Sequence, residues 1–173
     1  MRALAPLVLA AAVLAPGLTR AELENEVKAA YLYRFLSYLE WPPPDLDGDG
    51  SPFVIGVVGA DDVYEALREI VQGRSAQGRA IEVRRLKEGD DTLGVHMVFV
   101  GRAAAGSLGK MASRKAIVVG EVEGALERGA AINLVRTADH VRFEVAPQVA
   151  ERKGVRISSR MLSVAARVET GAP

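Results

Sequence analysis

Helical spacing of apolar residues dominates the first part of the chain. In residues 24–41 these side chains cover about half of a helix circumference, which is typical of a helix docked on a core. The expected buried face consists of Val27, Tyr31, Leu32, Phe35, Leu36, Tyr38 and Leu39. Tyr33 falls on the opposite, polar side, so we expect its ring to be exposed. Three prolines lack backbone donors and end the helix near Trp41.

Continuous apolar runs predict buried strands. "PFVIGVVG", "HMVFVG" and "KAIVVGE" are short, β-rich and uncharged in the middle, which is typical of parallel strands covered on both faces. "RAIEVRRL" alternates apolar and charged residues, so one of its faces should contact water.

Between the strands the spacing of apolar residues returns to the helical period. A helix with Asp61 or Asp62 as its cap should carry Val63, Ala66, Leu67, Ile70 and Val71. A weaker helix is expected at residues 103–113, and two helical turns at 123–130, although glycines lower the propensity of the first.

The last part of the chain predicts a hairpin and two helices. Two strands within residues 131–146 join at Thr137–His140. Their shared face should consist of Ile132, Leu134, Val141, Phe143 and Val145. Pro147 opens a short helix, and Ser158 or Ser159 caps a last one. That last helix should carry Met161, Leu162, Val164, Ala165 and Val168.

The order of these elements fixes the expected fold class. Strands that alternate with helices favour an α/β domain with a mostly parallel sheet and helices on both faces. This is a Rossmann-like sandwich that ends in an antiparallel C-terminal hairpin strand. About 150 residues suffice for one core, so we expect a single domain over residues 22–173.

The first 21 residues have the pattern of a secretory signal peptide. A positive start at Arg2 precedes the uncharged run Ala3–Ala15, and cleavage after the small residue Ala21 would leave Glu22 first. The run is too short for an ordinary membrane span, so an uncleaved anchor is the weaker alternative. Since the chain has no cysteine, a lipoprotein is excluded. We therefore expect an exported, periplasmic protein.

Charge and composition exclude several classes of protein. The chain has 22 basic and 22 acidic side chains, so removal of Arg2 and Arg20 with the leader leaves a net charge of −2. That balance provides no basic field for nucleic acid. With no cysteine, thiol chemistry, disulfides and Cys-based metal sites are absent.

The loops that follow the parallel strands are the default ligand site in such folds. Their backbone N–H groups and Arg102 could hold an anionic metabolite. The candidate ligand-binding residues are Gly59, Asp61, Gly101, Arg102 and Gly120. For Arg102 an ordinary exposed arginine is the favoured alternative, and for Asp61 a helix cap.

No catalytic constellation emerges from the sequence. The glycines around Gly56 do not match a dinucleotide fingerprint, and His96 and His140 have no partners at metal-ligand spacing. Ser158 and Ser159 lack a nucleophile elbow. We therefore expect no cofactor, no metal and no enzymatic activity, and a hydrolase would need an activated nucleophile that the sequence does not supply.

Three residues of the first helix predict a surface for a partner. Tyr33, Arg34 and Trp41 have the composition of an interface hot spot, in which Tyr, Arg and Trp are enriched. The alternative for Trp41 is a lid on the core, because a lone Trp in a small domain is usually mostly buried.

Long stretches of the chain resemble the YfiR/HmsC-like family of exported regulators. "EVKAAYLYRFLSYLEWP" resembles the opening helix of the family, and "FVIGVVGADDVYEALREI" its first strand and helix. The run from Glu123 to Val168 resembles its closing segment, in which Asn133, Phe143, Ser158 and Ser159 match. The chain lacks the cysteines with which some members sense redox state.

The resemblance implies a role as well as a fold. It implies a periplasmic homodimer that binds the periplasmic domain of an inner-membrane signalling protein and represses a membrane-bound diguanylate cyclase, thereby controlling cyclic-di-GMP and biofilm. The alternative is a small-ligand-binding sensor subunit for a membrane receptor or histidine kinase.

Overall fold

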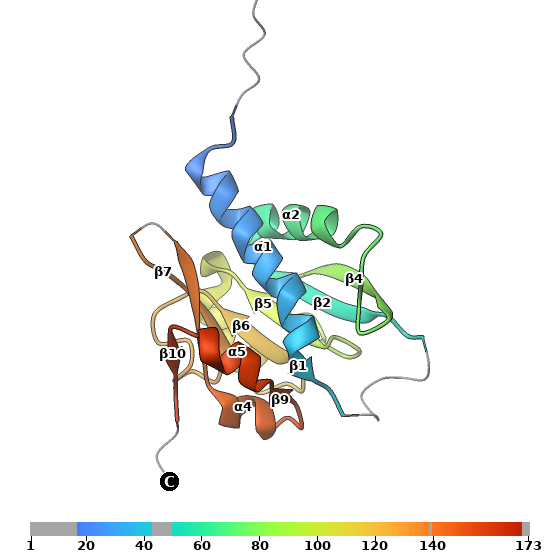
Figure 1. The fold of residues 1–173 in the computed structure, drawn as a ribbon, viewed down its shortest axis with the longest axis vertical. Coiled ribbons are helices and arrows are strands. Elements are labelled where there is room, and N and C mark those ends of the chain that lie inside the picture. The colour runs from blue at the N-terminus through green and yellow to red at the C-terminus, as the bar shows by residue number, and fades with distance from the viewer. Residues whose placement is uncertain (1–16, 43–49, 139, 171–173) are drawn as a thin grey trace, which may run out of the picture.

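The computed structural model describes residues 17–42, 50–138 and 140–170 (Figure 1). Most of the predicted signal peptide, residues 1–16, lies outside the described residues, as does the segment 43–49 with two of the three prolines. Within the described part of the chain, no helix is long and apolar enough to cross a membrane.

Helix α1 (Arg20–Tyr38) begins earlier and ends earlier than predicted. Thr19 is its N-cap and forms a capping box with Glu22, so the expected cleavage point after Ala21 lies inside the first turn. The helix ends at Tyr38 because Leu39–Glu40 form strand β1, which pairs with β9 (Arg156–Ile157). Pairing with a distant strand could not be predicted from local spacing.

The buried face of α1 is largely as predicted, with two corrections. Leu32, Phe35, Leu36 and Leu39 are buried, but Val27 is 42% exposed. Its neighbour Lys28 is turned toward the sheet and is buried instead. Tyr33, expected to be exposed, is half-buried, because its hydroxyl donates to the carbonyl of Ser75 (3.4 Å) in a short strand that the sequence did not predict.

One sheet of eight strands forms the centre of the domain, in the order β10-β8-β7-β6-β5-β2-β4-β3. The long strands are β2 (Phe53–Val58), β4 (Arg79–Leu86), β5 (Met97–Val100), β6 (Ile117–Gly120), β7 (Ile132–Arg136) and β8 (Val141–Val145). The short strands at its edges are β3 (Ser75–Ala76) and β10 (Arg167–Val168). Among the described strands of this sheet, only the pairs β3/β4 and β7/β8 are antiparallel, which confirms the predicted mostly parallel sheet.

Side chains of the central strands alternate between two hydrophobic clusters. Ile55, Phe99 and Val119 face the cluster that also contains residues of α1 and of α2 (Asp61–Val71). Val98 and Val118 face the other cluster, with the 3-10 helix η2 (Arg102–Ser107) and α3 (Leu108–Ala112). Helices therefore cover both faces, and α1 runs diagonally across the front face of the sheet in Figure 1.

The predicted C-terminal hairpin is confirmed, with Leu134 opposite Phe143 and Ile132 opposite Val145. Two of the predicted helices are wrong in extent or type. Residues 123–130 form turns, because Gly124 and Gly129 have positive φ values of 71° and 95°. After α4 (Pro147–Glu151), α5 spans only Ser159–Val164, and Val168 lies in β10 instead, parallel to β8.

A tight turn between β3 and β4 holds the end of α1. Gln77 and Gly78 both have positive φ, 49° and 77°, as in the two-residue turns that match the twist of a hairpin. The side-chain amide Nε2 of Gln77 donates to the carbonyls of Leu36 (2.7 Å) and Leu39 (2.9 Å). These carbonyls lie at the end of α1, where helical partners run out, so Gln77 ties the helix end to the edge of the sheet.

Candidate functional site

The three predicted glycines lie side by side at the carboxyl ends of parallel strands. Gly59 and Gly101 directly follow β2 and β5, and Gly120 ends β6. The backbones of the loops after β2 and β5 are in close contact. A Cβ atom at Gly59 would lie 2.6 Å from that of Ala104, and one at Gly101 would overlap the carbonyl of Gly59. The glycines therefore allow close packing of backbone at this edge.

In the loop after β5, a backbone N–H group already donates to a carboxylate of the chain itself. Glu121 accepts a hydrogen bond from the N–H of Arg102 (3.0 Å), and its other oxygen lies 2.7 Å from Nζ of Lys28. Glu121 and Lys28 are each only 8% exposed. A buried carboxylate thus takes the place in which we expected an external anion.

The other two predicted ligand-binding residues point to different neighbours. Arg102 has an exposed side chain whose Nε lies 3.9 Å from Glu121, and Asp61 lies 3.3 Å from Arg85 on β4. Asp61 belongs to the first turn of α2 and does not cap it, since Ala60 is the N-cap. A ligand-binding role for the five residues stays a prediction.

Charges of α1 extend this network toward the hairpin. Lys28 also lies 2.8 Å from Glu24, whose second oxygen is 3.5 Å from Arg136 on β7. The hydrogen bond from Lys28 lowers the pKa of the Glu24 carboxyl, against the opposing effect of its partial burial. The alternation of acid and base fixes the amino-terminal half of α1 over the sheet.

Replacing Lys28 tests this anchor. Lys28→Met leaves the buried Glu121 without its closest cation, so we expect the free energy of unfolding to fall by about 2–4 kcal/mol, measured by urea denaturation at pH 7. The matched control Lys110→Met, at an exposed lysine of α3, should change it by less than about 0.5 kcal/mol. Equal stability of the two variants would contradict the anchor.

A second candidate site is an apolar groove of about 400 Å³ between α1 and α5, here called the α1/α5 groove. Its floor is a cluster of three rings, in which Phe35 and Phe143 (5.2 Å) and Tyr31 and Phe143 (5.4 Å) meet edge to face. The lining residues are Tyr31, Arg34, Phe35, Tyr38, Phe143, Arg160, Met161 and Val164.

The mouth of the α1/α5 groove combines apolar and cationic groups. Val164 is an apolar residue but is 58% exposed. It lies on α5, in which Met161 is the buried residue. Arg34 and Arg160 are both exposed residues of the lining, one from each helix. A lining that combines an exposed aliphatic side chain with two arginines fits an apolar anchor with acidic neighbours.

The predicted partner residues Tyr33, Arg34 and Trp41 do not form one surface. Arg34 lies in the α1/α5 groove, whereas Tyr33 faces β3 with the guanidinium of Arg74 5.6 Å from its ring centroid. The sequence did not single out Phe143, Arg160 or Val164 as surface partners. The helical spacing of Met161 and Val164 predicts that they share a face of α5, but the sequence does not show that this face lies beside α1.

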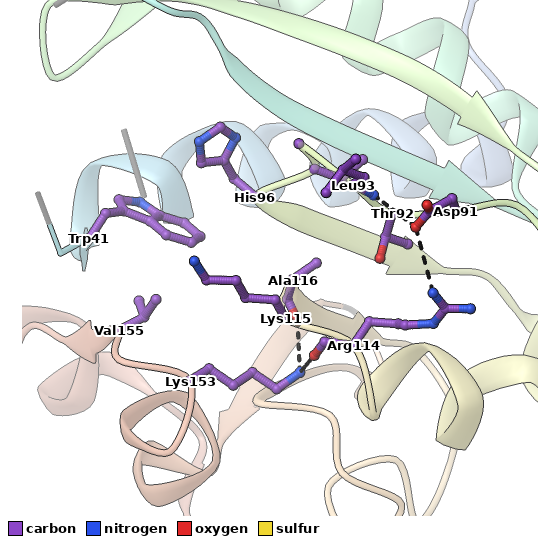
Figure 2. A pocket seen from close by; sticks show the side chains of 12 residues that line it. Trp41, Asp91, Thr92, Leu93, His96, Arg114, Lys115, Ala116, Lys153 and Val155 are labelled. Atoms are coloured by element: carbon purple, nitrogen blue, oxygen red, sulfur yellow. Dashed lines mark hydrogen bonds and ion pairs between the residues drawn. The ribbon is translucent and has the colours of Figure 1, made fainter. Parts of the chain in front are cut away.

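Trp41 lines a third site, a cavity of about 340 Å³ at the amino ends of β5 and β6 (Figure 2), here called the Trp41 cavity. Its ring is half-buried and packs edge to face with His96 (5.6 Å), which in turn packs against Phe53 (5.2 Å). Nδ1 of His96 accepts a hydrogen bond from the N–H of Val54 (3.1 Å), which holds the imidazole in place.

Lys153 forms the opposite wall of the Trp41 cavity and is held by three carbonyls. Its Nζ donates to Ala112 (2.9 Å), Arg114 (2.8 Å) and Ala116 (2.7 Å). Burial lowers the pKa of Lys153 to about 8. The three acceptors favour the charged form and burial opposes it, and the lowered pKa means that burial has the larger effect.

This balance predicts how stability changes with pH. In the unfolded chain the lysine pKa is about 10.4, so between pH 8 and about 10.4 the unfolded state binds more protons and the cost of burying the cation is relieved. We expect wild type to gain stability relative to Lys153→Met as the pH rises from 7 to 10, measured by chemical denaturation. A relative loss would mean that the carbonyls raise the pKa instead.

Among the described residues, no group of three or more His, Cys, Asp or Glu side chains could hold a metal ion. The geometry thus offers an ion-paired loop cluster, an apolar groove and a cavity with a cationic wall. A family model described as YfiR/HmsC-like matches residues 25–166, which include all three.

The chain belongs to the YfiR/HmsC-like family. Membership supports the coarse expectation of a periplasmic regulator of signalling. No curated protein matches the chain.

Two solved structures share the fold with low sequence identity. A conserved domain protein from Vibrio cholerae O1 biovar El Tor N16961 is 15% identical, and an ABC domain in complex with L-Trp from Streptococcus pneumoniae is 12% identical. Both have a TM-score of 0.54 and cover 84% of this chain. The chain spans about 60% of the length of each. Because the sequence identity is this low, the likeness concerns the fold alone.

Proposed function

We propose that this YfiR/HmsC-like protein is a non-enzymatic periplasmic regulator that binds the periplasmic domain of an inner-membrane signalling protein. Its effect is to repress a membrane-bound diguanylate cyclase, which lowers cyclic-di-GMP and limits biofilm. The observation that carries the proposal is the α1/α5 groove, an apolar cleft with Arg34 and Arg160 in its lining on a domain of a regulator family.

The chemistry of the groove fits a protein partner. Tyr31, Phe35 and Phe143 form a stiff aromatic floor, and the hydroxyl of Tyr31 donates to the carbonyl of Val141 (3.2 Å). A preformed apolar surface binds without a large ordering cost. The partner should present an apolar side chain over Val164 and acidic groups to Arg34 and Arg160.

Regulation follows from differential affinity. A domain that binds the inactive arrangement of the partner more tightly than the active one shifts the population toward the inactive state. Tenfold repression needs about 1.4 kcal/mol of difference, which a few contacts in the groove supply. In this proposal the regulator acts as a homodimer, so that it matches a partner that is itself two-fold symmetric.

A charge in the groove should abolish regulation in cells. Deletion of the gene should raise intracellular cyclic-di-GMP, and a wild-type copy should restore it. Val164→Asp places a carboxylate at the groove, where partner docking would bury it, so it should fail to restore repression. Leu23→Asp, a matched change at a 48% exposed residue of α1 that lines neither the groove nor the Trp41 cavity, should restore it. Cyclic-di-GMP that does not respond to deletion would contradict the repressor role.

A small-ligand sensor is the second candidate, and the Trp41 cavity favours it. Arg114, Lys115 and Lys153 contribute positive charge to its lining, and Asp91, 3.5 Å from Arg114, is the one acid among the described residues of the lining. A cavity with an indole wall and excess positive charge suits a small anionic molecule.

A thermal-shift screen with nucleotides, amino acids and cell-wall fragments tests the sensor. We expect one class to raise the melting temperature by about 2 °C or more, and Lys115→Glu to remove the shift, since it reverses a charge in the lining. Lys110→Glu on α3 is the matched control. No shift with any class would remove this candidate.

A further inference from the structure

The outer edge of β4 is open. β4 has eight residues, and β2 pairs with six of them on one side, from Ile81 to Leu86. On the other side β3 covers only Arg79 and Ala80. Among the described residues, the six positions from Ile81 to Leu86 therefore have no strand beyond them. An open edge of this length can accept another strand by backbone hydrogen bonding.

The turn before β4 determines which backbone groups face the open edge. Gln77 and Gly78 form a two-residue turn, so the flanking pair Ala76 and Arg79 is a hydrogen-bonded pair of the hairpin. The N–H and C=O of Arg79 thus point toward β3. Because this direction alternates along a strand, the same groups of Ile81, Val83 and Arg85 point outward.

Side chains on the open edge carry opposite charges two residues apart. Nε of Arg84 lies 2.6 Å from Oε1 of Glu82, and the two side chains are 42% and 45% exposed. The hydrogen bond from Arg84 lowers the pKa of the Glu82 carboxyl. Arg85, on the other face, is already engaged by Asp61 (3.3 Å) and Glu65 (2.7 Å) of its own chain. Glu82 and Arg84 pair with each other within β4, so a facing strand with the opposite order of charges can exchange these contacts without leaving a charge unpaired.

We propose that a second copy of this chain pairs with the open edge of β4, antiparallel and with the two-fold axis beside Val83. In an antiparallel pair, the side chains of opposite residues lie on the same face of the sheet. A two-fold axis perpendicular to the sheet must therefore pass beside one residue, which lies opposite the same residue of the other copy. With Val83 at the axis, Glu82 lies opposite Arg84 of the other copy, and the contact occurs twice. The outward N–H of each Val83 then donates to the carbonyl of Val83 in the other copy.

Shifted registers bring like charges together. An axis at Glu82 places two carboxylates opposite each other, and an axis at Arg84 or Arg85 places two guanidinium groups opposite each other. Like charges directly across a strand pair are destabilising, and charged edges in general discourage unselective pairing. An axis at Ile81 would place Glu82 opposite Ala80, where β3 already pairs, and an axis at Leu86 would place Arg85 opposite Lys87 of the other copy. The axis at Val83 is therefore the symmetric register that remains for Ile81–Leu86. This proposal names the interface of the homodimer in the proposed function and rests on that part of it alone.

Charge reversal with a compensating swap tests the register. In sedimentation experiments on the purified chain from about 1 to 500 µM, Glu82→Arg and Arg84→Glu should each weaken dimerisation at least about tenfold. The double variant Glu82→Arg/Arg84→Glu should restore it to within about threefold, because the swapped charges face each other again. Glu40→Arg, at an exposed ion pair with Arg156 away from the edge, is the control and should dimerise like wild type.

A cross-link gives an independent readout of the same geometry. The chain has no cysteine, so Val83→Cys places a single thiol at the axis, and a short bismaleimide should join two chains. Ser113→Cys, an exposed residue after α3, should give no dimer at the same concentration. A monomeric wild type at 500 µM, a swap that fails to restore dimers, or equal cross-linking at both positions would overturn the proposal. Since none of these measurements involves cyclic-di-GMP, failure here is distinguishable from failure of the regulatory role.

Discussion

The docking of α1 across the sheet is the constraint on which the rest of the structure depends. A helix with one apolar face must bury it, and here the face meets the sheet through Leu32, Phe35 and Leu36. Two polar contacts then fix its position: Lys28 binds Glu121 near the amino-terminal half, and Gln77 holds the carbonyls at the carboxyl end. Burial supplies most of the favourable free energy, and the two polar contacts give each half of the helix a fixed partner on the sheet.

Each candidate site follows from the position of α1. At the carboxyl ends of the strands, its Lys28 completes an ion-pair cluster that fills the space where folds of this outline usually bind ligands. Along its side, Tyr31 and Phe35 meet Phe143 and form the floor of the α1/α5 groove. Just beyond its end, Trp41 reaches the opposite edge of the sheet and lines the Trp41 cavity. The proposed recognition surface therefore lies away from the strand ends at which such folds usually bind ligands.

The sequence predicts the parts of this structure that arise from local periodicity. The parallel core strands, the hairpin around Thr137 and the buried face of α1 are all readable, because burial on one or both faces leaves a repeat of 2 or 3.6 residues. Contacts between distant segments leave no such repeat. The short strands β1 and β9, the buried Lys28, and the half-buried Tyr33 depend on partners far away in the chain. For the same reason Arg34 could be predicted as a surface residue, but its neighbours Arg160 and Val164 could not.

Hydrogen exchange can locate the surface that recognises a membrane partner, which we propose to be the α1/α5 groove. The most direct measurement is amide hydrogen exchange of the purified chain with and without the periplasmic domain of a membrane-bound diguanylate cyclase from the same organism. Protection should increase in residues 31–38 and 159–164 and stay unchanged in the loops after β2, β5 and β6. Protection that increases only in those loops, at residues 59–62, 101–107 and 120–125, would contradict the proposal.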